Sequence, residues 1–467
     1  MDRGITRRAF IKKAAVAGVS MTALPSLLAA CGGGASQSPA QGENVSLTVW
    51  TGNGTQEERW RVDGPAQAAS DVDTYNISVN PVNDSAKWDD YKRKFTLAAD
   101  AGEAPNIVVS GHEDVAVWSQ AGYIEPFDDC RSAHSEFDDV KDSLWSAASF
   151  DGKTWGVPQD VEVRPMYFNK DKLAELGWSQ EEIDSLPQRI QNGEFTLDDL
   201  VDTAKQAVDK GVVDSGYGYW HRPSKGGDFL QYYVAYGGRL QDEGGDKLVV
   251  ARDPLVSWYA FQRKVVESGI TPENYIGTTD EVWHDTVSHG KALFWNGGIW
   301  NWADWAKNYV SDLGGDDYLS SFVGYALQPS GTQGSQGVTL SHPLLYMITT
   351  DSASGASNQD PSCDLLAKTT TPEINTLHAN SSTHLGILKS QADDQDYTDN
   401  GLLSDVGYML DYNFYQPNNA EFGPYFDALW DNMVKAENGD MSPDDAADQA
   451  ISLVKVNVSD PDQVIFE

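Results

Sequence analysis

Tryptophan is the residue type that most directly indicates a ligand in this chain. The sequence holds 15 tryptophans, and four of them fall within eleven residues: Trp295, Trp300, Trp302 and Trp305. The C–H faces of a sugar ring pack on flat aromatic side chains, while its hydroxyl groups need carboxylate, amide or guanidinium partners. The cluster therefore predicts a neutral polyol ligand, with Trp302 and Trp305 expected to be core or helix-packing residues.

Charged side chains that could complete such a site precede the segment 167–170. Asp160, Glu162 and Arg164 stand at alternate positions, and residues i and i+2 of a strand share one face. Arg164 would make a forked contact with a ligand, or it would neutralise its acidic neighbours. Two carboxylates on one face would also be compatible with the chemistry of a glycosidase.

Patterns for metals and for other catalysis are missing from the sequence. His284 and His289 lie five residues apart, which does not match the i, i+4 spacing of a helical zinc site, and the eight histidines form no denser group. The acidic stretch 394–401 lacks the glycine that a calcium loop needs at its sixth position. No nucleophile elbow or phosphate-binding loop is present. We expect neither a metal nor a cofactor.

The N-terminal stretch indicates where the protein works. Arg7 and Arg8 precede a short apolar segment that closes with Leu-Ala-Ala before Cys31. This arrangement resembles a twin-arginine export signal that ends in a lipobox, and Gly18 and Pro25 make it a poor membrane span. We expect residues 1–30 to be removed, Cys31 to carry lipid and residues 31–43 to form a flexible tether.

The charge of the chain is strongly acidic. Its formal net charge is −37, although the first thirty residues hold five basic residues and only one acid. A carboxylate-rich surface stays hydrated and is screened in concentrated salt, so we interpret it as halophilic and of haloarchaeal type. Nucleic acid and anionic lipid headgroups are excluded as partners, because both need clusters of lysine and arginine.

The elements that must position these residues alternate at the start of the chain. Residues 45–50 read as a strand, and they lead through the turn 51–54 into a helix that ends near Ala69. A strand over 76–82, a helix over 89–101 and a short buried strand over 106–109 follow, which predicts parallel α/β construction. Further on, Thr196, Thr371 and Ser442 each stand at the start of a predicted helix, and the last two precede proline.

Length and cysteine content bound the architecture. The chain of 467 residues exceeds the size at which single cores usually split, so two lobes are expected. Besides Cys31, the sequence holds Cys130 and Cys363, which in an oxidising location would be bridged or would remain two free buried thiols.

Several short segments, in this order, resemble the extracellular solute-binding proteins of ABC transporters, the large family that includes the maltose-binding proteins. The resemblance covers most of the chain after the tether. It rests on segments 47–50, 118–126, 155–158, 167–170, 233–238, 290–294, 298–300 and 385–390.

The resemblance implies a fold of two α/β lobes, joined by three hinge crossings, with the ligand in the cleft between them. We place the crossings near Val161, Ser330 and Asp396. The first lobe would combine residues 44–160 with 331–395, and the second would combine 161–330 with 396–467. Cys130 and Cys363 would then share the first lobe, which makes a disulfide between them possible.

The same resemblance implies a set of ligand contacts. Trp300 matches the family's stacking position, and Glu162 matches a position that faces sugar hydroxyls. The predicted set, contributed by the turn after the first strand, the 112–114 loop, the first crossing and the second lobe, is Trp50, Asn53, His112, Glu113, Asp114, Asp160, Glu162, Arg164, Trp220, Asp228, Trp295, Trp300, Tyr415 and Phe422.

The function that these observations predict is that of a receptor and not of an enzyme. A monomeric, lipid-anchored protein outside the cell would capture a sugar and present it to the permease subunits of an ABC importer. Two alternatives stay open from the residues. Aromatic and acidic side chains also suit a polyamine or betaine cation, and Asp160 with Glu162 would suit a secreted glycosidase.

Overall fold

The computed structural model describes residues 38–242, 245 and 247–467. The predicted signal and its lipid-carrying cysteine, Cys31, lie outside the described residues, so both remain predictions. Within the described part of the chain, no helix combines the length and the apolar character needed to cross a membrane.

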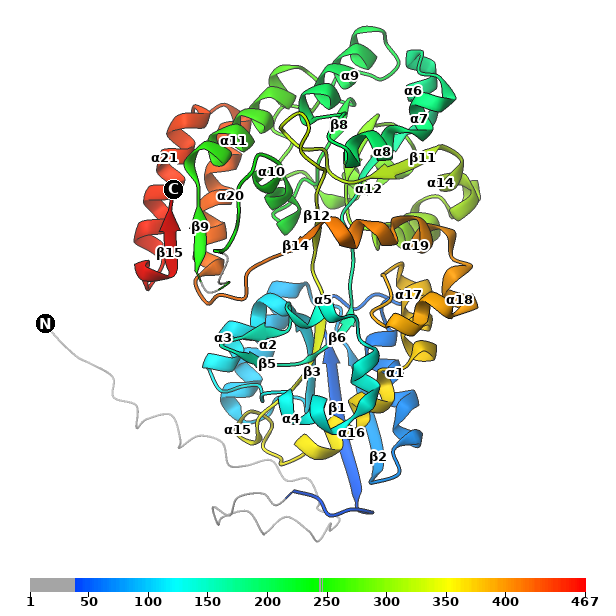
Figure 1. Ribbon diagram of the computed structural model, residues 1–467, viewed down its shortest axis with the longest axis vertical. Helices are drawn as coiled ribbons and strands as arrows, with labels where there is room; N and C mark the ends of the chain where they lie inside the picture. Colours follow the sequence, from blue (N-terminus) through cyan, green and yellow to red (C-terminus); the bar gives the residue numbers. More distant parts are fainter. Residues whose placement is uncertain (1–37, 243–244, 246) are drawn as a thin grey trace, which may run out of the picture. The chain divides into compact units, whose positions relative to one another are not determined.

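The first of two main β-sheets has the strand order β2-β1-β3-β13-β6 and lies in the lower lobe of Figure 1. Its strands are β1 (Asn44–Thr51), β2 (Asn76–Asn83), β3 (Ile107–Gly111), β6 (Val157–Asp160) and β13 (Leu344–Ile348). β1 pairs in parallel with β2 and β3, whereas β13 is antiparallel to β3 and β6. The prediction of a parallel sheet is therefore wrong for β13, which returns from a distant part of the chain.

The start of the first lobe follows the hydrophobic pattern of the sequence. Val45, Leu47 and Val49 alternate with more exposed residues along β1, and their side chains are buried in the core. Helix α1 (Trp60–Ala68) contacts β1 and β2, and α2 (Trp88–Ala101) lies between β2 and β3 in the chain. The predicted alternation of strand and helix is confirmed for these five elements.

The second main sheet lies in the upper lobe of Figure 1 and has the order β11-β7-β10-β8. Its strands are β7 (Met166–Asn169), β8 (Tyr219–Trp220), β10 (Phe294–Asn296) and β11 (Val323–Ala326). β7 is antiparallel to β10 and β11, while β8 and β10 run parallel. The predicted mixed α/β fold with two lobes is confirmed.

The predicted helix starts are confirmed by side-chain caps. Thr196 accepts a hydrogen bond from the amide of Asp199 at the start of α9 (Leu197–Asp209). Thr371 and Ser442 cap α17 (Pro372–Ser382) and α21 (Pro443–Asn457) in the same way, each with proline at the first helical position.

Further helices and strand pairs complete the two lobes. The other α-helices of the described chain are α3 (Val115–Gln120), α4 (Asp128–Ala133), α5 (Asp142–Trp145), α6 (Lys170–Leu176), α7 (Gln180–Asp184), α8 (Leu186–Gln191), α10 (Leu230–Ala235), α11 (Arg252–Glu267), α12 (Asp280–Ser288), α13 (Asn301–Asp304), α14 (Asp316–Phe322), α15 (Asp351–Ser354), α16 (Gln359–Thr369), α18 (Gln395–Thr398), α19 (Gly401–Val406) and α20 (Phe422–Asn438). Three two-stranded pairs are β4 (Ser149–Phe150) with β5 (Lys153–Thr154), β9 (Leu248–Val250) with β15 (Val464–Phe466), and β12 (Thr339–Ser341) with β14 (Asn413–Tyr415).

The chain passes between the two sheets on separate segments. It leaves the first sheet between β6 and β7, returns between β11 and β13, and leaves again after α17 through α18 and α19. The β12–β14 pair lies between the lobes (Figure 1). Val161, Ser330 and Asp396 fall on these three segments, while the lobe boundaries to the residue stay a prediction.

A disulfide joins two distant segments of the first lobe. Cys130 on α4 is bonded to Cys363 on α16, with 5.7 Å between their Cα atoms and 233 residues between them in the chain. The two cysteines are therefore bridged in the structure and are not free thiols. A crosslink that closes so long a loop restricts the unfolded chain strongly.

Candidate functional site

The side chains that best fit a ligand site lie where the first crossing leaves β6. Glu162 and Arg164 stand on the segment between β6 and β7, and both are buried. The backbone amide of Arg164 donates a hydrogen bond to Thr339 on β12, which fixes this segment against the second crossing. Both side chains therefore sit at the boundary of the two lobes.

Arg164 gathers three predicted contacts around its guanidinium group. One Nη atom lies 3.1 Å from Glu162, the other lies 3.0 Å from Asp228, and the group stands over the Trp300 ring at 5.0 Å. Burial lowers the pKa of Arg164, but the two carboxylates outweigh it and raise the pKa above its usual value. The sequence left open whether Arg164 faces a ligand or neutralises its neighbours, and here it neutralises them beside an indole ring.

Glu162 has an unusual proton affinity for a carboxyl group. Burial raises its pKa to about 7, because Arg164 and His342 offset the loss of hydration only in part. Near neutral pH this carboxyl can accordingly be protonated or ionised. It can both donate and accept hydrogen bonds toward hydroxyl groups.

Trp300 reaches from the second lobe toward the first. Its ring folds over Gly298, where a Cβ atom would lie 1.7 Å from the ring, so the glycine of this Gly-X-Trp pattern makes room for the indole. The ring is nearly parallel to that of His384 in the first lobe, with 6.1 Å between centroids and 16° between planes. Trp300 is thus a contact between the lobes.

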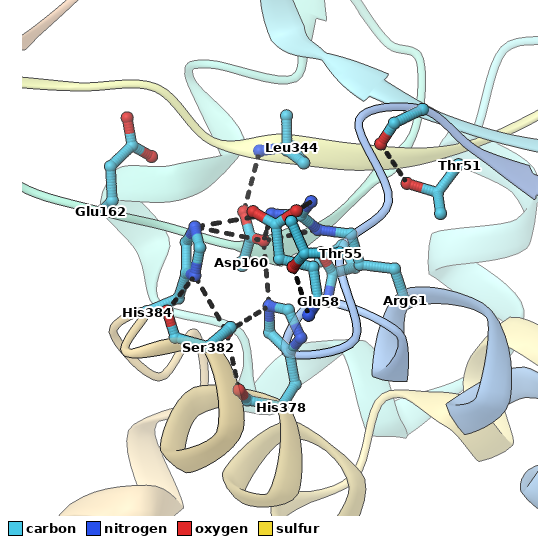
Figure 2. Close-up of polar contacts among 12 residues, drawn as sticks. Thr51, Thr55, Glu58, Arg61, Asp160, Glu162, Leu344, His378, Ser382 and His384 are labelled. Atoms are coloured by element: carbon cyan, nitrogen blue, oxygen red, sulfur yellow. Dashed lines mark hydrogen bonds and ion pairs between the residues drawn. The ribbon is translucent and has the colours of Figure 1, made fainter. Parts of the chain in front are cut away.

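A buried polar network supports this boundary from the first lobe (Figure 2). Asp160, at the end of β6, pairs with Arg61 of α1 at 2.9 Å and lies 3.0 Å from His378. Arg61 also pairs with Glu58 at 3.1 Å. Burial raises the pKa of Asp160, but Arg61 and the two neighbouring histidines, His378 and His384, outweigh it and hold this pKa well below the usual range.

The loop after β3 forms a second polar group. Glu113 pairs with Lys92 at 2.6 Å and with His342 at 2.5 Å, while Asp114 pairs with Lys92 at 2.9 Å. Burial raises the pKa of Glu113, but His342 and Lys92 outweigh it and place the pKa well below its usual value. These carboxylates are bound by cations of the protein, and the ligand contacts predicted for Glu113 and Asp114 stay predictions.

His112 and Tyr415 meet next to this loop. One His112 ring nitrogen lies 3.0 Å from the carbonyl oxygen of Gln416, directly after β14. The rings of His112 and Tyr415 meet edge to face at 5.9 Å. The structure therefore brings these two predicted residues together across the lobe boundary.

Trp50 and Asn53 lie apart from these groups at the end of β1. Lys94 stands over the Trp50 ring at 4.9 Å. Asn53 is exposed, has a φ of +48°, and its amide donates to the carbonyl of Ala86. The structure shows what holds these two residues, and their predicted ligand contacts stay predictions.

Three residues of the predicted ligand set have side chains that pack inside the second lobe, and their contact with a ligand stays a prediction. Trp220 stacks on Tyr217 and is 3% exposed. Trp295 stacks on Tyr167 at 5.6 Å. Every residue of the short strands β8 and β10 is buried, so a tryptophan on either strand packs against protein on whichever face of the sheet it lies.

Phe422, the third of these residues, begins α20. Its ring lies parallel to that of Phe426 one turn later, at 5.9 Å, and it is 6% exposed. The expectation that Trp302 and Trp305 are core residues is confirmed, since both are buried.

Sequence reasoning missed several residues of the boundary. Arg61, His342, His378 and His384 come from three parts of the chain that lie up to 323 residues apart. The histidines therefore do form denser groups in space, although not along the chain. A buried acid such as Asp160 requires a partner cation, and that requirement is the only signal that could have suggested Arg61.

Three groups of side chains in the described chain have metal-like spacing, and each already has another partner. In the group of His112, Glu113 and His342, the carboxylate of Glu113 is ion-paired with Lys92. In the group of Asp160, His378 and His384, the carboxylate of Asp160 is ion-paired with Arg61. In the third group, Cys363 forms a disulfide with Cys130. None of these sets fits a cation well, because the acids already face a protein cation or the thiol is oxidised.

Two cavities have linings that include none of the predicted ligand residues. A groove of about 410 Å³ in the second lobe is lined by β11, α19 and neighbouring side chains, among them Tyr325 and Trp302. A space of about 10 Å³ lies beside Gln159 and His378 in the first lobe. At the lobe boundary, by contrast, Glu162, Arg164, Asp228 and Trp300 pack on one another.

Comparison with known proteins places this geometry in a family. The profile of the bacterial extracellular solute-binding proteins matches residues 67–404. A binding protein of Brucella abortus is 23% identical over 269 residues, which are 57% of this chain and 59% of that protein. The chain thus spans about three fifths of the length of the curated relatives it matches.

Solved structures share the fold at low sequence identity. The GacH receptor of Streptomyces glaucescens, studied unliganded and with acarbose, has a TM-score of 0.70 and 18% identity, over 90% of this chain and 99% of its own. The maltose-bound MalE3 of T. maritima has a TM-score of 0.69 and 17% identity, over 88% and 99%. A solute-binding protein from Thermotoga lettingae, bound to α-D-tagatose, has a TM-score of 0.69 and 16% identity, over 88% and 99%.

Proposed function

Because this chain belongs to the family of bacterial extracellular solute-binding proteins, we propose that it is a receptor that captures a sugar between its lobes for an ABC importer. The lobes would close on the sugar, and the permease subunits would receive it chemically intact. Contacts made from both lobes to one ligand are what stabilise such a closed state.

The observation that carries this proposal is the setting of Trp300. A flat indole at the lobe boundary stands beside a guanidinium group, which in turn binds two carboxylates, Glu162 and Asp228. A sugar offers C–H faces for the ring and hydroxyl groups for the polar atoms around it. The polar atoms carry nearly balanced charge, which suits a neutral ligand.

The arrangement favours a sugar over the two alternatives. Arg164 already places a positive charge beside Trp300, and this charge would repel the ammonium group of a polyamine or betaine but not a neutral sugar. A glycosidase would need Asp160 and Glu162 as a working pair, but Asp160 is buried and bound by Arg61 and His378. Such a carboxylate is not free for acid or nucleophile chemistry.

The location of the receptor is part of the proposal. The twin-arginine pattern around Arg7 and Arg8 and the lipobox at Cys31 support export and a lipid anchor, and the acidic surface supports a saline medium. We propose a monomer tethered outside the membrane, with the permease and the membrane as its partners.

A fluorescence titration with a matched control tests the proposal. The protein in molar salt is titrated with mono-, di- and oligosaccharides, including maltose and D-tagatose, and with putrescine and glycine betaine. Trp178 is the control for Trp300, because it is also half-buried and also carries an arginine, Arg189, over its ring at 5.7 Å.

The expected result is saturable binding of one saccharide by the wild type and by Trp178→Ala. Trp300→Ala should bind it about tenfold more weakly, the size of one lost aromatic stacking contact. Binding of putrescine or betaine alone would support the cation alternative instead. Equal affinities of the two variants would contradict the role of Trp300.

A further inference from the structure

His384 is a first-lobe residue that no sequence pattern singled out. It lies two residues after the end of α17 and is 4% exposed. Its ring lies nearly parallel to that of Trp300, which belongs to the second lobe. It is thus the first-lobe half of a ring pair that exists only while the lobes are together.

The backbone before His384 is strained. Thr383 ends α17 in the left-handed conformation, with φ of 55° and ψ of 48°. A β-branched residue rarely adopts this conformation, and glycine is the usual choice at such a helix end. Strain of this kind persists only when the surroundings hold it, and it often marks a side chain that must point in one direction. Here the strained residue turns the chain so that His384 faces Trp300.

Hydrogen bonds fix the ring and its charge state. Nη2 of Arg61 lies 3.4 Å from Nε2 of His384, and a guanidinium group can only donate. Nε2 must therefore be the acceptor, while Nδ1 carries the proton and faces the carbonyl oxygen of Ser382 at 3.2 Å. Figure 2 shows the ring held between Asp160 and Ser382.

The titratable groups around His384 agree with a neutral ring. Asp160 lies 3.9 Å from Nε2, and the His378 ring lies 5.3 Å away. Burial lowers the pKa of His384, Asp160 opposes this effect, and Arg61 and His378 lower the pKa further, to about 3. The imidazole thus meets Trp300 as an uncharged, oriented plane.

We propose that His384 is a positioning residue of the ligand site, whose ring fixes the plane of Trp300 on which the sugar packs. This proposal rests on the proposed function. Because the two rings come from different lobes, their contact stabilises only the closed state. A residue that lowers the free energy of the closed state alone raises the apparent affinity for any ligand that binds this state.

The test compares two histidines of the same buried network. His378 is buried and bound to Asp160, but it pairs with the carboxylate and not with Trp300. His384→Leu and His378→Leu both remove a partner of the network, whereas only the first removes the ring beside Trp300. His384→Gln keeps a hydrogen-bond donor and an acceptor near Arg61 and Ser382. It therefore serves as the milder variant in case His384→Leu does not fold.

The expected result is a loss of about 3- to 10-fold in saccharide affinity for His384→Leu and His384→Gln, the range of one aromatic pair. His378→Leu should stay within about twofold of the wild type. In the Trp300→Ala background, His384→Gln should cause no further loss, because the contact is already gone. Equal losses in the two histidine variants, or additive losses with Trp300→Ala, would overturn the proposal.

A measurement without ligand separates this proposal from the proposed function. Small-angle X-ray scattering should show a larger radius of gyration for His384→Gln than for wild type and His378→Leu, because the open state gains population. If no sugar binds the wild type but this difference is present, the proposed function fails and the ring contact stands. If sugar binds but neither affinity nor scattering distinguishes the histidines, only the role of His384 is refuted.

Discussion

Asp160 and Glu162 stand two residues apart and are both buried, but their pKa values are shifted in opposite directions. Asp160 faces Arg61, His378 and the amide of Leu344, and its pKa lies well below the usual range. Glu162 shares one guanidinium group with Asp228, and its pKa rises to about 7. Asp160, whose hydrogen-bond partners are all within the protein, therefore holds the fold, while Glu162 keeps bonding capacity that a ligand could use.

The largest effect is expected from removing the Asp160 carboxylate. Asp160→Ala leaves the buried Arg61 with one carboxylate partner, Glu58, and removal of one partner of a buried ion pair destabilises a protein by about 3–5 kcal/mol. Denaturant unfolding in molar salt measures this loss. Glu162→Gln is the control, and it should cost less than about 1 kcal/mol because Arg164 keeps Asp228.

A comparable cost for the two variants would contradict the division into a structural and a ligand-facing carboxylate. Asp160→Asn offers a milder version of the same comparison, because its amide keeps the shape and part of the hydrogen bonding. It should fall between the other two variants in unfolding free energy.

The next effect is a dependence of stability on pH. Glu162 holds its proton more tightly in the folded protein than in the unfolded chain, where its pKa is about 4.5. The folded state binds more protons between these values, so the contribution of Glu162 to stability is lost as pH rises from about 4.5 through about 7, by up to about 3 kcal/mol. Unfolding at pH 5 and pH 8 measures this loss.

Glu162→Gln should remove this contribution, because an amide does not titrate in this range. Asp160, whose pKa is depressed, contributes stability above the unfolded value near 3.8 and loses it only as pH falls below that value. A wild type and a Glu162→Gln variant with parallel stability profiles from pH 5 to pH 8 would refute the assignment of this step to Glu162.

The smallest effect sharpens the comparison at Asp228. Asp228→Asn leaves Arg164 to Glu162 alone and removes a nearby negative charge, which should stabilise the ionised form of Glu162. The midpoint of the pH step should therefore move to lower pH by about half a unit to one unit. An unchanged midpoint would show that Arg164 does not link the two carboxylates. Asp184→Asn, an exposed carboxylate on α7, is the control.

The sequence was informative where local pattern decides the structure. Alternation along 45–50 and the caps at Thr196, Thr371 and Ser442 predicted elements that the structure has, since these signals act within a few residues. The contact among Glu162, Arg164 and Trp300 lay within the predicted ligand set because the family resemblance ordered those positions.

The rest depends on contacts between distant segments. The antiparallel β13, the pairing of Arg61 with Asp160, and the stacking of His384 on Trp300 each join parts of the chain that lie far apart, and no periodicity encodes them. The packing of Trp220 and Trp295 inside the second lobe could not be read from the sequence for the same reason. The sequence around an aromatic residue next to a loop does not show whether that residue is buried in the second lobe or exposed to a ligand.

Native mass spectrometry of the protein with a mixture of saccharides, putrescine and glycine betaine tests the central claim most directly, because it weighs whatever the closed lobes retain. We expect one adduct per chain with the mass of an intact saccharide, reduced in Trp300→Ala and retained in Trp178→Ala. An adduct of putrescine or betaine, or a saccharide with a cleaved glycosidic bond, would contradict this claim.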